Sequence, residues 1–312
     1  MDKTTVIVLG ASGMLGSMVV DVLSRDETIN LIATVRSEEL ASKCKNLFPQ
    51  VEWRIFNITD EHAATQKSLK LLGAQQWVVN AIGLTKPYTH DDDPMEIERA
   101  IRINALLPYE LGHAAAESGG RVLQIATDCV FDGVKGNYLE EDSHNPLDVY
   151  GKSKSLGEPL LPNVHCLRCS IIGPEPKVYA FLLEWFRRQT QNGQVNGYTN
   201  HQWNGVTTLH FAHLCHGVIK HGIELQHVQH IVPTGTISKA ELLQCFARGY
   251  EREDITITPT KATKIIDRTL STTNQTLNRQ LWEAAGYQEP PSVPQMVAEL
   301  ARFDYRMALE VQ

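Results

Sequence analysis

A tyrosine and a lysine four residues apart, Tyr150 and Lys154, are the residues whose types and spacing could transfer a proton. The segment around them, residues 148–158, is predicted to be helical, and positions i and i+4 of a helix lie on one face. The Lys154 ammonium would then lower the pKa of the Tyr150 phenol from about 10 and make it a usable acid near neutral pH. A solvent-exposed helix face produces the same spacing, so other elements have to agree.

A glycine-rich turn, Gly10-Ala-Ser-Gly13-Met-Leu-Gly16, follows the first predicted strand at residues 4–10 and leads into a helically spaced apolar segment. Strand, glycine turn and helix form the context that binds a dinucleotide pyrophosphate, because the backbone can approach closely and the helix N-terminus supplies N–H donors. A glycine turn without a ligand is the alternative.

The second predicted strand, residues 30–36, ends in Arg36, where an NAD-binding chain usually carries Asp or Glu. A guanidinium at this position suits a 2′-phosphate, so the sequence favours NADP(H) over NAD(H). The alternative is a solvent-exposed loop arginine.

Strands and helices alternate through the first 172 residues, with further strands predicted at 51–58, 76–82, 121–128 and 165–172 and helices at 60–72, 94–118 and 149–161. This alternation indicates an α/β class with a Rossmann-type, doubly wound parallel sheet. Later in the chain, helices are predicted at 178–192, 208–222, 238–249, 277–286 and 292–310, with a turn-rich loop at 193–205 and a strand at 227–232. We therefore expect a dinucleotide-binding domain at 1–172, to which 207–232 return. A smaller mixed C-terminal cap, for the substrate, would comprise 173–206 and 233–312.

The 312 residues include 29 Lys and Arg against 36 Asp and Glu, a dispersed net charge of −7 that argues against a nucleic-acid partner. No secretion signal is recognised and no apolar run reaches about 18 residues, so no membrane span is predicted. The six cysteines lie in apolar surroundings and are predicted to be reduced thiols in a cytoplasmic protein. His210, His213 and His216 recur every third residue of a predicted helix, which spreads them around it, and no metal site is expected.

Two polar residues accompany the tyrosine. Thr127 lies near the end of the strand predicted at 121–128, at the edge where open parallel sheets bind ligands, and its hydroxyl could bond a substrate carbonyl. Asn104 interrupts an apolar helical stripe, so its amide is expected to bond backbone groups or an ordered water.

Together these motifs resemble the extended short-chain dehydrogenase/reductases, and within them the dTDP-4-dehydrorhamnose reductase family. The matching stretches are residues 10–16, 80–81, 103–108, 126–133, 150–154 and 157–158. The resemblance implies that Tyr150 is the general acid, Lys154 its pKa-lowering and ribose-binding partner, Thr127 the carbonyl orienter and Asn104 a support of the proton relay.

The resemblance also implies binding residues. Besides Tyr150 and Lys154, the cofactor contacts would be Gly10, Ser12, Gly13, Met14, Leu15, Gly16, Arg36, Asn57, Ile58, Asn80, Ala81, Ile82 and Gly83. Candidate substrate contacts are Lys86, Asp128, Cys129, Trp203, Asn204 and Thr207, although Trp203 fits equally well as core of the cap. The chain departs from the family at Cys129, usually tyrosine, at Asn57, usually Asp beside the adenine, and over residues 197–205, where the sugar nucleotide should lie.

The implied activity is NADPH-dependent reduction of a nucleotide-linked 4-keto-6-deoxy sugar, with hydride delivered to C4. A nucleotide-sugar epimerase remains an alternative, as does a non-catalytic NADP-binding regulatory subunit. A dehydratase is disfavoured because it needs an Asp-Glu pair where this chain has Asp128-Cys129. The expected partner is a nucleotide sugar, and a homodimer stays open. The sequence does not indicate the sugar, the nucleotide or the C4 stereochemistry.

Overall fold

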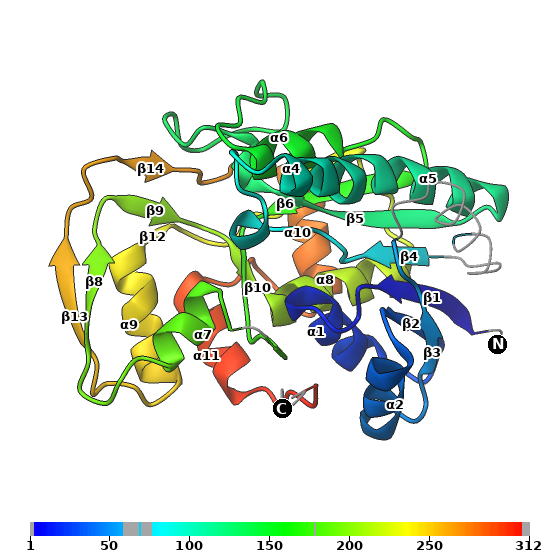
Figure 1. The fold of residues 1–312 in the computed structure, drawn as a ribbon, viewed down its shortest axis with the longest axis horizontal. Coiled ribbons are helices and arrows are strands. Elements are labelled where there is room, and N and C mark those ends of the chain that lie inside the picture. Colours follow the sequence, from blue (N-terminus) through cyan, green and yellow to red (C-terminus); the bar gives the residue numbers. More distant parts are fainter. Residues whose placement is uncertain (1–2, 59–68, 70–76, 178, 308–312) are drawn as a thin grey trace.

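The computed structural model describes residues 3–58, 69, 77–177 and 179–307 (Figure 1). A seven-stranded parallel sheet with the order β11-β6-β5-β4-β1-β2-β3 forms its centre. The strands are β1 (Thr4–Leu9), β2 (Ile29–Val35), β3 (Glu52–Ile55), β4 (Trp77–Asn80), β5 (Arg121–Thr127), β6 (Val164–Cys169) and β11 (Val228–His230). The chain order reverses between β1 and β4, which is where such sheets bind their ligands. The predicted Rossmann-type class is confirmed.

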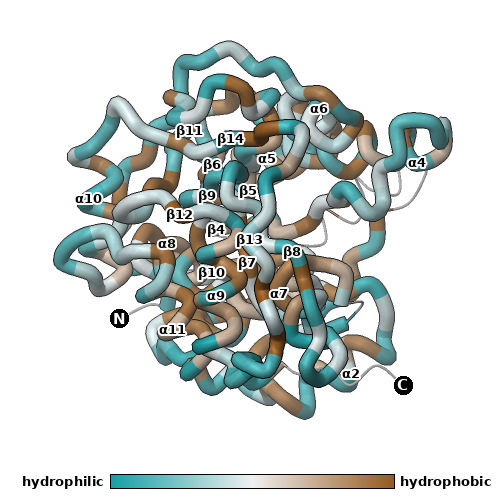
Figure 2. The backbone as a smooth tube through the Cα atoms, turned by 90° about the vertical axis from the view of Figure 1, so that its left-hand side faces the viewer, coloured by the Kyte–Doolittle hydropathy of each residue, from teal (hydrophilic) through white to brown (hydrophobic). Residues whose placement is uncertain are grey.

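Helices cover both faces of the sheet because the strand residues are apolar on both sides. Val6 and Val8 of β1 face α1 (Met14–Leu23) and α8 (Thr208–His221), whereas Ile7 and Leu9 face the helix α5 (Leu107–Glu117). Figure 1 shows α4 (Pro94–Ala100), α5 and α6 (Val149–Leu156) on one side of the sheet and α1 and α8 on the other. The short α2 (Glu38–Leu47) lies beside β2 and β3. Along the backbone, the outer turns are mostly hydrophilic (Figure 2).

The helix predicted at 94–118 is not one continuous α-helix. A π-helical segment, η2 (Ile101–Leu106), separates α4 from α5. Pro108 lies two residues beyond this segment and has no N–H to donate to the carbonyl oxygen of Asn104, which explains why the α-helical ladder breaks here. Most of the helix predicted at 60–72 lies outside the described residues.

The C-terminal part forms helices and short sheets, most of them on the left of Figure 1, while α10 lies in the middle, packed on α8. Its elements are β7 (Ile171–Ile172), α7 (Leu182–Arg187), β8 (Gln194–Tyr198), β9 (His201–Trp203), β10 (Val206–Thr207), β12 (Ile237–Ser238), α9 (Lys239–Gly249), β13 (Thr256–Thr260), β14 (Ile266–Asp267), α10 (Gln275–Ala284) and α11 (Val293–Arg302). The prediction of a loop at 193–205 was wrong, because β8 pairs with β13 and β9 pairs with both β12 and β14. None of the helices in the described ranges is long and apolar enough to cross a membrane. All six cysteines are free thiols.

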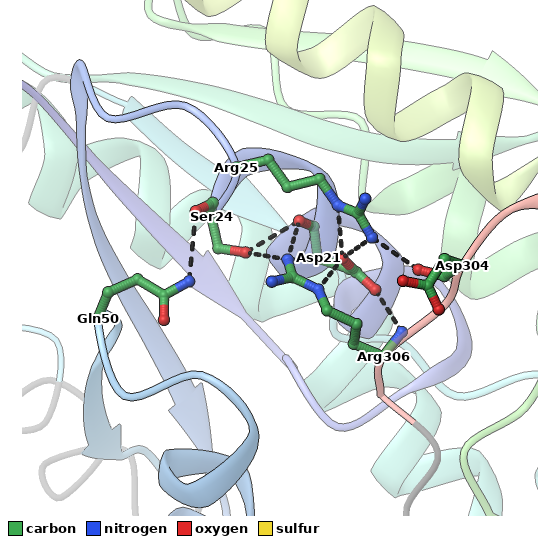
Figure 3. Close-up of polar contacts among 6 residues, drawn as sticks. All are labelled: Asp21, Ser24, Arg25, Gln50, Asp304 and Arg306. Atoms are coloured by element: carbon green, nitrogen blue, oxygen red, sulfur yellow. Dashed lines mark hydrogen bonds and ion pairs between the residues drawn. The ribbon is translucent and has the colours of Figure 1, made fainter.

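After α11 the chain returns to α1 (Figure 3). Asp21 of α1 is fully buried, and its carboxylate accepts hydrogen bonds from the Arg25 side chain and from both the backbone and the side chain of Arg306 at 2.7–3.0 Å. The Tyr305 hydroxyl lies 2.6 Å from Ser17 Oγ. The segment 303–307 is thereby fastened to the helix that follows the glycine turn.

Candidate active site

The glycine turn is shaped for a close backbone approach. Gly10 has φ +75°, and a Cβ there would lie 2.9 Å from Cγ1 of Ile82, while a Cβ on Gly16 would overlap with the Gly10 carbonyl oxygen. Among the described residues, no side chain caps the N-terminus of α1 at Gly13. The first N–H groups of α1 therefore remain available to an anion.

The sheet brings most predicted cofactor residues, and the predicted catalytic residue Thr127, to one edge. Gly10, Arg36, Asn57, Ala81 and Thr127 lie at or just beyond the carboxyl ends of β1, β2, β3, β4 and β5, which are parallel neighbours. Six other predicted cofactor residues adjoin these positions in the sequence, namely Ser12, Met14, Leu15, Ile58, Ile82 and Gly83.

The side chain of Asn80 forms hydrogen bonds within the protein. It is fully buried, donates to Gln124 Oε1 at 2.8 Å and accepts from the Ile82 N–H at 3.1 Å. Its side chain therefore shapes the end of β4, and a cofactor would meet the residues after it.

Tyr150 lies in the first turn of α6, whose N-cap Asp148 accepts a hydrogen bond from the Gly151 N–H at 2.8 Å. The phenol is half-buried, and burial raises its pKa above the usual value. Cys129 acts in the same direction, whereas hydrogen bonding with Thr127 opposes the shift. This contradicts the expectation of a lowered pKa.

The position of Lys154 explains why it does not lower the pKa of Tyr150. It is buried one turn further along α6, and its ammonium donates to the Ile125 carbonyl oxygen of β5 at 2.6 Å. Burial lowers the pKa of Lys154. The two side chains share a helix, but the amine is anchored to the strand that carries Thr127, and the phenol responds mainly to its own burial.

Asn104, in the π-helical segment η2, links three parts of the site. Its amide nitrogen donates to the Leu84 carbonyl oxygen and to Ser153 Oγ, both at 3.0 Å, and its oxygen accepts from the Leu84 N–H at 2.8 Å. The Ser153 hydroxyl in turn donates to the Tyr150 carbonyl oxygen at 3.0 Å. The prediction that this amide bonds backbone groups is confirmed.

Thr127, Asp128 and Cys129 form the turn after β5. The buried Thr127 hydroxyl donates to Asp128 Oδ1 and accepts from the Cys129 N–H, each at 3.2 Å. Burial raises the pKa of the Asp128 carboxyl and raises that of the Cys129 thiol to about 12. The thiol is therefore protonated at neutral pH.

The predicted substrate residues divide into two groups. Lys86 pairs with Asp148 at 2.7 Å, at the start of α6, and so lies close to the tyrosine helix. Trp203 is only 4% exposed and donates to Ser170 Oγ, in keeping with a role as cap core.

The other two, Asn204 and Thr207, form hydrogen bonds within the protein. The Asn204 amide bonds both backbone groups of Leu270, and the fully buried Thr207 hydroxyl caps α8 and contacts His210. Their predicted contact with the substrate stays a prediction.

Sequence reasoning missed Lys239, the first residue of α9. Its ammonium lies 5.2 Å from the centre of the Trp203 ring, on the cap side of the site. Burial lowers the pKa of Lys239 to about 8, and the nearby Asp128 and Cys129 oppose this shift. The local sequence predicts only a helix start, because Ser238 and Glu241 form a capping box.

The buried Arg168 binds Glu158, just beyond the C-terminal end of α6. Arg168 of β6 binds Glu158 with two hydrogen bonds of 2.6 and 3.1 Å and also bonds Nε2 of His230 and of His144. Because arginine only donates, both histidines must accept through Nε2. The Nδ1–H of His230 then donates to the Ser271 carbonyl oxygen at 2.7 Å.

The fold and site define a Rossmann-type protein of the short-chain dehydrogenase/reductase kind. Residues 4–304 match the family model described as RmlD substrate binding domain, and the chain belongs to this family. Curated relatives include two dTDP-4-dehydrorhamnose reductases. The one from Aggregatibacter actinomycetemcomitans is 40% identical over 85 residues, covering 27% of this chain and 28% of that protein. The one from Mycolicibacterium smegmatis is 25% identical over 185 residues, covering 59% and 46%. The chain thus spans less than half the length of these relatives.

Solved structures share the fold over nearly the whole chain. The dTDP-4-dehydrorhamnose reductase from Bacillus anthracis, in complex with NADP, has a TM-score of 0.69 at 17% identity and covers 96% of this chain and 98% of that one. The UDP-glucuronic acid 4-epimerase from Bacillus cereus, in complex with UDP-glucuronic acid and NAD, has a TM-score of 0.73 at 13% identity and covers 98% and 100%.

Proposed function

We propose that this protein reduces the C4 ketone of a nucleotide-linked 4-keto-6-deoxy sugar with NADPH as the hydride donor. The observation that carries the proposal is one cluster at the carboxyl edge of the sheet. Tyr150 interacts with Thr127 there, while Asn104, Ser153 and Lys154 hold the helix of the tyrosine against β5 and η2.

The groups beside this cluster fit an anionic dinucleotide. The backbone of the glycine turn and the uncapped N-terminus of α1 suit a pyrophosphate, and Arg36 suits a 2′-phosphate. When bound, the nicotinamide cofactor supplies the hydride. The preference for NADP(H) over NAD(H) is part of this proposal.

Tyr150 would act as the general acid. A raised pKa keeps the proton on the phenol at neutral pH, which is the state needed to protonate an alkoxide forming at C4. Thr127 would bond the same oxygen and stabilise its developing negative charge. Lys154 and Asn104 would act by positioning α6 and the segment around Leu84.

On the substrate side, Lys86, Asp128, Cys129 and Lys239 are the proposed contacts. Their polar groups would bond sugar hydroxyls, and the two lysine ammonium groups would bind the anionic nucleotide. With a pKa of about 12, the Cys129 thiol cannot serve as the base that a dehydratase needs, so the turn after β5 supports reduction over dehydration.

Two other functions have specific support. The structural likeness to a UDP-glucuronic acid 4-epimerase keeps an epimerase open, since it would use the same tyrosine without net consumption of cofactor. A curated relative from Bos taurus, 35% identical over 81 residues that cover 26% of this chain and 23% of that protein, is called methionine adenosyltransferase 2 subunit beta. It supports the alternative of a regulatory subunit.

The test is Tyr150→Phe measured against wild type. NADPH oxidation would be followed with dTDP- and UDP-linked 4-keto-6-deoxy sugars, and cofactor affinity by nicotinamide fluorescence. We expect turnover to fall about 10²- to 10⁴-fold, the usual contribution of a general acid, with NADPH affinity nearly unchanged. Equal inertness of both proteins towards every keto sugar would remove support for the reductase. A tightly bound nicotinamide that never exchanges would favour the epimerase.

A further inference from the structure

Lys177 crosses from the cap side of the molecule to the glycine turn. It belongs to the segment between β7 and α7, and its ammonium donates to Ser12 Oγ at 3.0 Å. Ser12 is buried in the turn between Gly10 and Gly13. Residues 165 positions apart in the sequence are thus joined at the place where a dinucleotide would bind.

The loop that carries Lys177 is held in shape by its own chain. The Glu175 carboxylate accepts hydrogen bonds from the backbone N–H groups of Ala180 and Phe181 at 3.1 and 2.7 Å. These hydrogen bonds join Glu175, two residues before Lys177, to Ala180 and Phe181.

A second cation faces the same point. Arg36 directly follows β2, whose Thr34 accepts hydrogen bonds from the backbone N–H groups of Gly10 and Ala11 at 3.3 and 3.0 Å. In keeping with this position, burial and then the charge of Arg36 lower the pKa of Lys177. Within the described residues, no carboxylate forms an ion pair with either of them, and the hydrogen-bond partner of Lys177 is an uncharged hydroxyl. Two cations brought together without an anion make a site for a doubly charged phosphate.

We propose that Lys177, Arg36 and Ser12 bind the 2′-phosphate of the cofactor's adenosine ribose, and that Lys177 is a specificity-determining residue for NADP(H). The pyrophosphate lies elsewhere in this scheme, on the backbone of the glycine turn and the N-terminus of α1. The inference rests on the proposed function only in requiring that a nicotinamide dinucleotide binds.

The experiment measures equilibrium affinities and needs no turnover. Wild type, Lys177→Met, Lys177→Arg and the control Lys45→Met, an exposed lysine of α2, would be titrated with 2′,5′-ADP, 5′-AMP, NADPH and NADH by calorimetry and nicotinamide fluorescence. Thermal unfolding without ligand would show that each variant is folded. For Lys177→Met we expect affinity for 2′,5′-ADP and NADPH to fall about 10- to 100-fold, as for the loss of a charge-assisted hydrogen bond. Affinity for 5′-AMP and NADH should stay within about twofold, and Lys177→Arg should restore most of the loss.

Several results would overturn this inference. An equal loss for NADPH and NADH would assign Lys177 to the pyrophosphate or to the turn itself, and unchanged affinities for both would mean that it contacts neither phosphate. Either outcome would leave the reductase proposal intact. A folded wild-type protein that binds neither dinucleotide would instead overturn the reductase and the 2′-phosphate site together.

Discussion

The partly buried charge of Lys239 lowers the free energy of unfolding of the protein, and Lys239→Met should remove this destabilisation. The pKa of this lysine falls from 10.5 to about 8 on folding. At about 1.4 kcal/mol for each pKa unit, keeping it protonated in the folded state costs about 3 kcal/mol at pH 7. We expect Lys239→Met to be more stable than wild type at pH 7 by about 1–3 kcal/mol, after allowing for the lost contact with Trp203.

The pH dependence provides the sharper test. Between about pH 8 and pH 10.5 the unfolded chain binds more protons at Lys239 than the folded protein does, so wild-type stability gains in this window relative to the variant. The advantage of Lys239→Met should therefore shrink as pH rises from 7 to 10. Groups that titrate equally in both proteins cancel in this difference.

The assay is urea unfolding at pH 7, 8, 9 and 10 for wild type, Lys239→Met and the exposed control Lys261→Met. The control should follow wild type within about 0.5 kcal/mol at every pH, as surface substitutions usually do. A stability difference that stays constant with pH, or a Lys239→Met variant less stable than wild type throughout, would refute the reasoning. A stabilised variant that has lost affinity for nucleotide sugars would agree with the proposed substrate contact, since functional sites often retain unfavourable charges.

Two further predictions concern the parts that hold α6. Nitrogen-15 NMR should find His230 as the Nδ1–H tautomer and neutral at pH 6, because burial and Arg168 lower its pKa to about 4; a protonated ring at that pH would contradict the network. Since the unfolded chain binds more protons at His230 between about pH 4 and 6.5, this residue should also make stability fall as pH drops through that window. Gly157→Ala should destabilise the protein by more than about 3 kcal/mol in chemical unfolding, because its Cβ would overlap with the Asn104 carbonyl oxygen. Gly119→Ala, which meets nothing within 4 Å but has φ +69°, should cost only about 1–2 kcal/mol, and equal losses would show that steric overlap is not the cause.

Local patterns were sufficient to predict the sheet and the order of the site residues. The sequence alternates regularly between apolar strands, turns and helically spaced segments up to Ile172. In a parallel sheet, the residues that follow the strands all lie at the same edge. This is why Thr127, Tyr150, Lys154 and the glycine turn could be expected near one another before the structure was known.

The missed features depend on contacts between distant segments. β8 has a single large apolar residue facing inwards, Val195, and becomes a strand because β13, some sixty residues later, pairs with it. Lys177 and Lys239 are ordinary lysines in the sequence, and only the packing of the cap brings them to Ser12 and Asp128. The pKa of Tyr150 was predicted in the wrong direction because spacing along a helix does not reveal burial.

The attachment of residues 303–307 to α1 has a consequence for how the protein is made. Arg306 is translated 285 residues after Asp21, whose fully buried carboxylate it neutralises together with Arg25. While the ribosome is still extending the chain, that carboxylate must stay hydrated or rely on Arg25 alone. The attachments that hold α1, the helix after the glycine turn, are therefore complete only once residue 306 has been added to the chain.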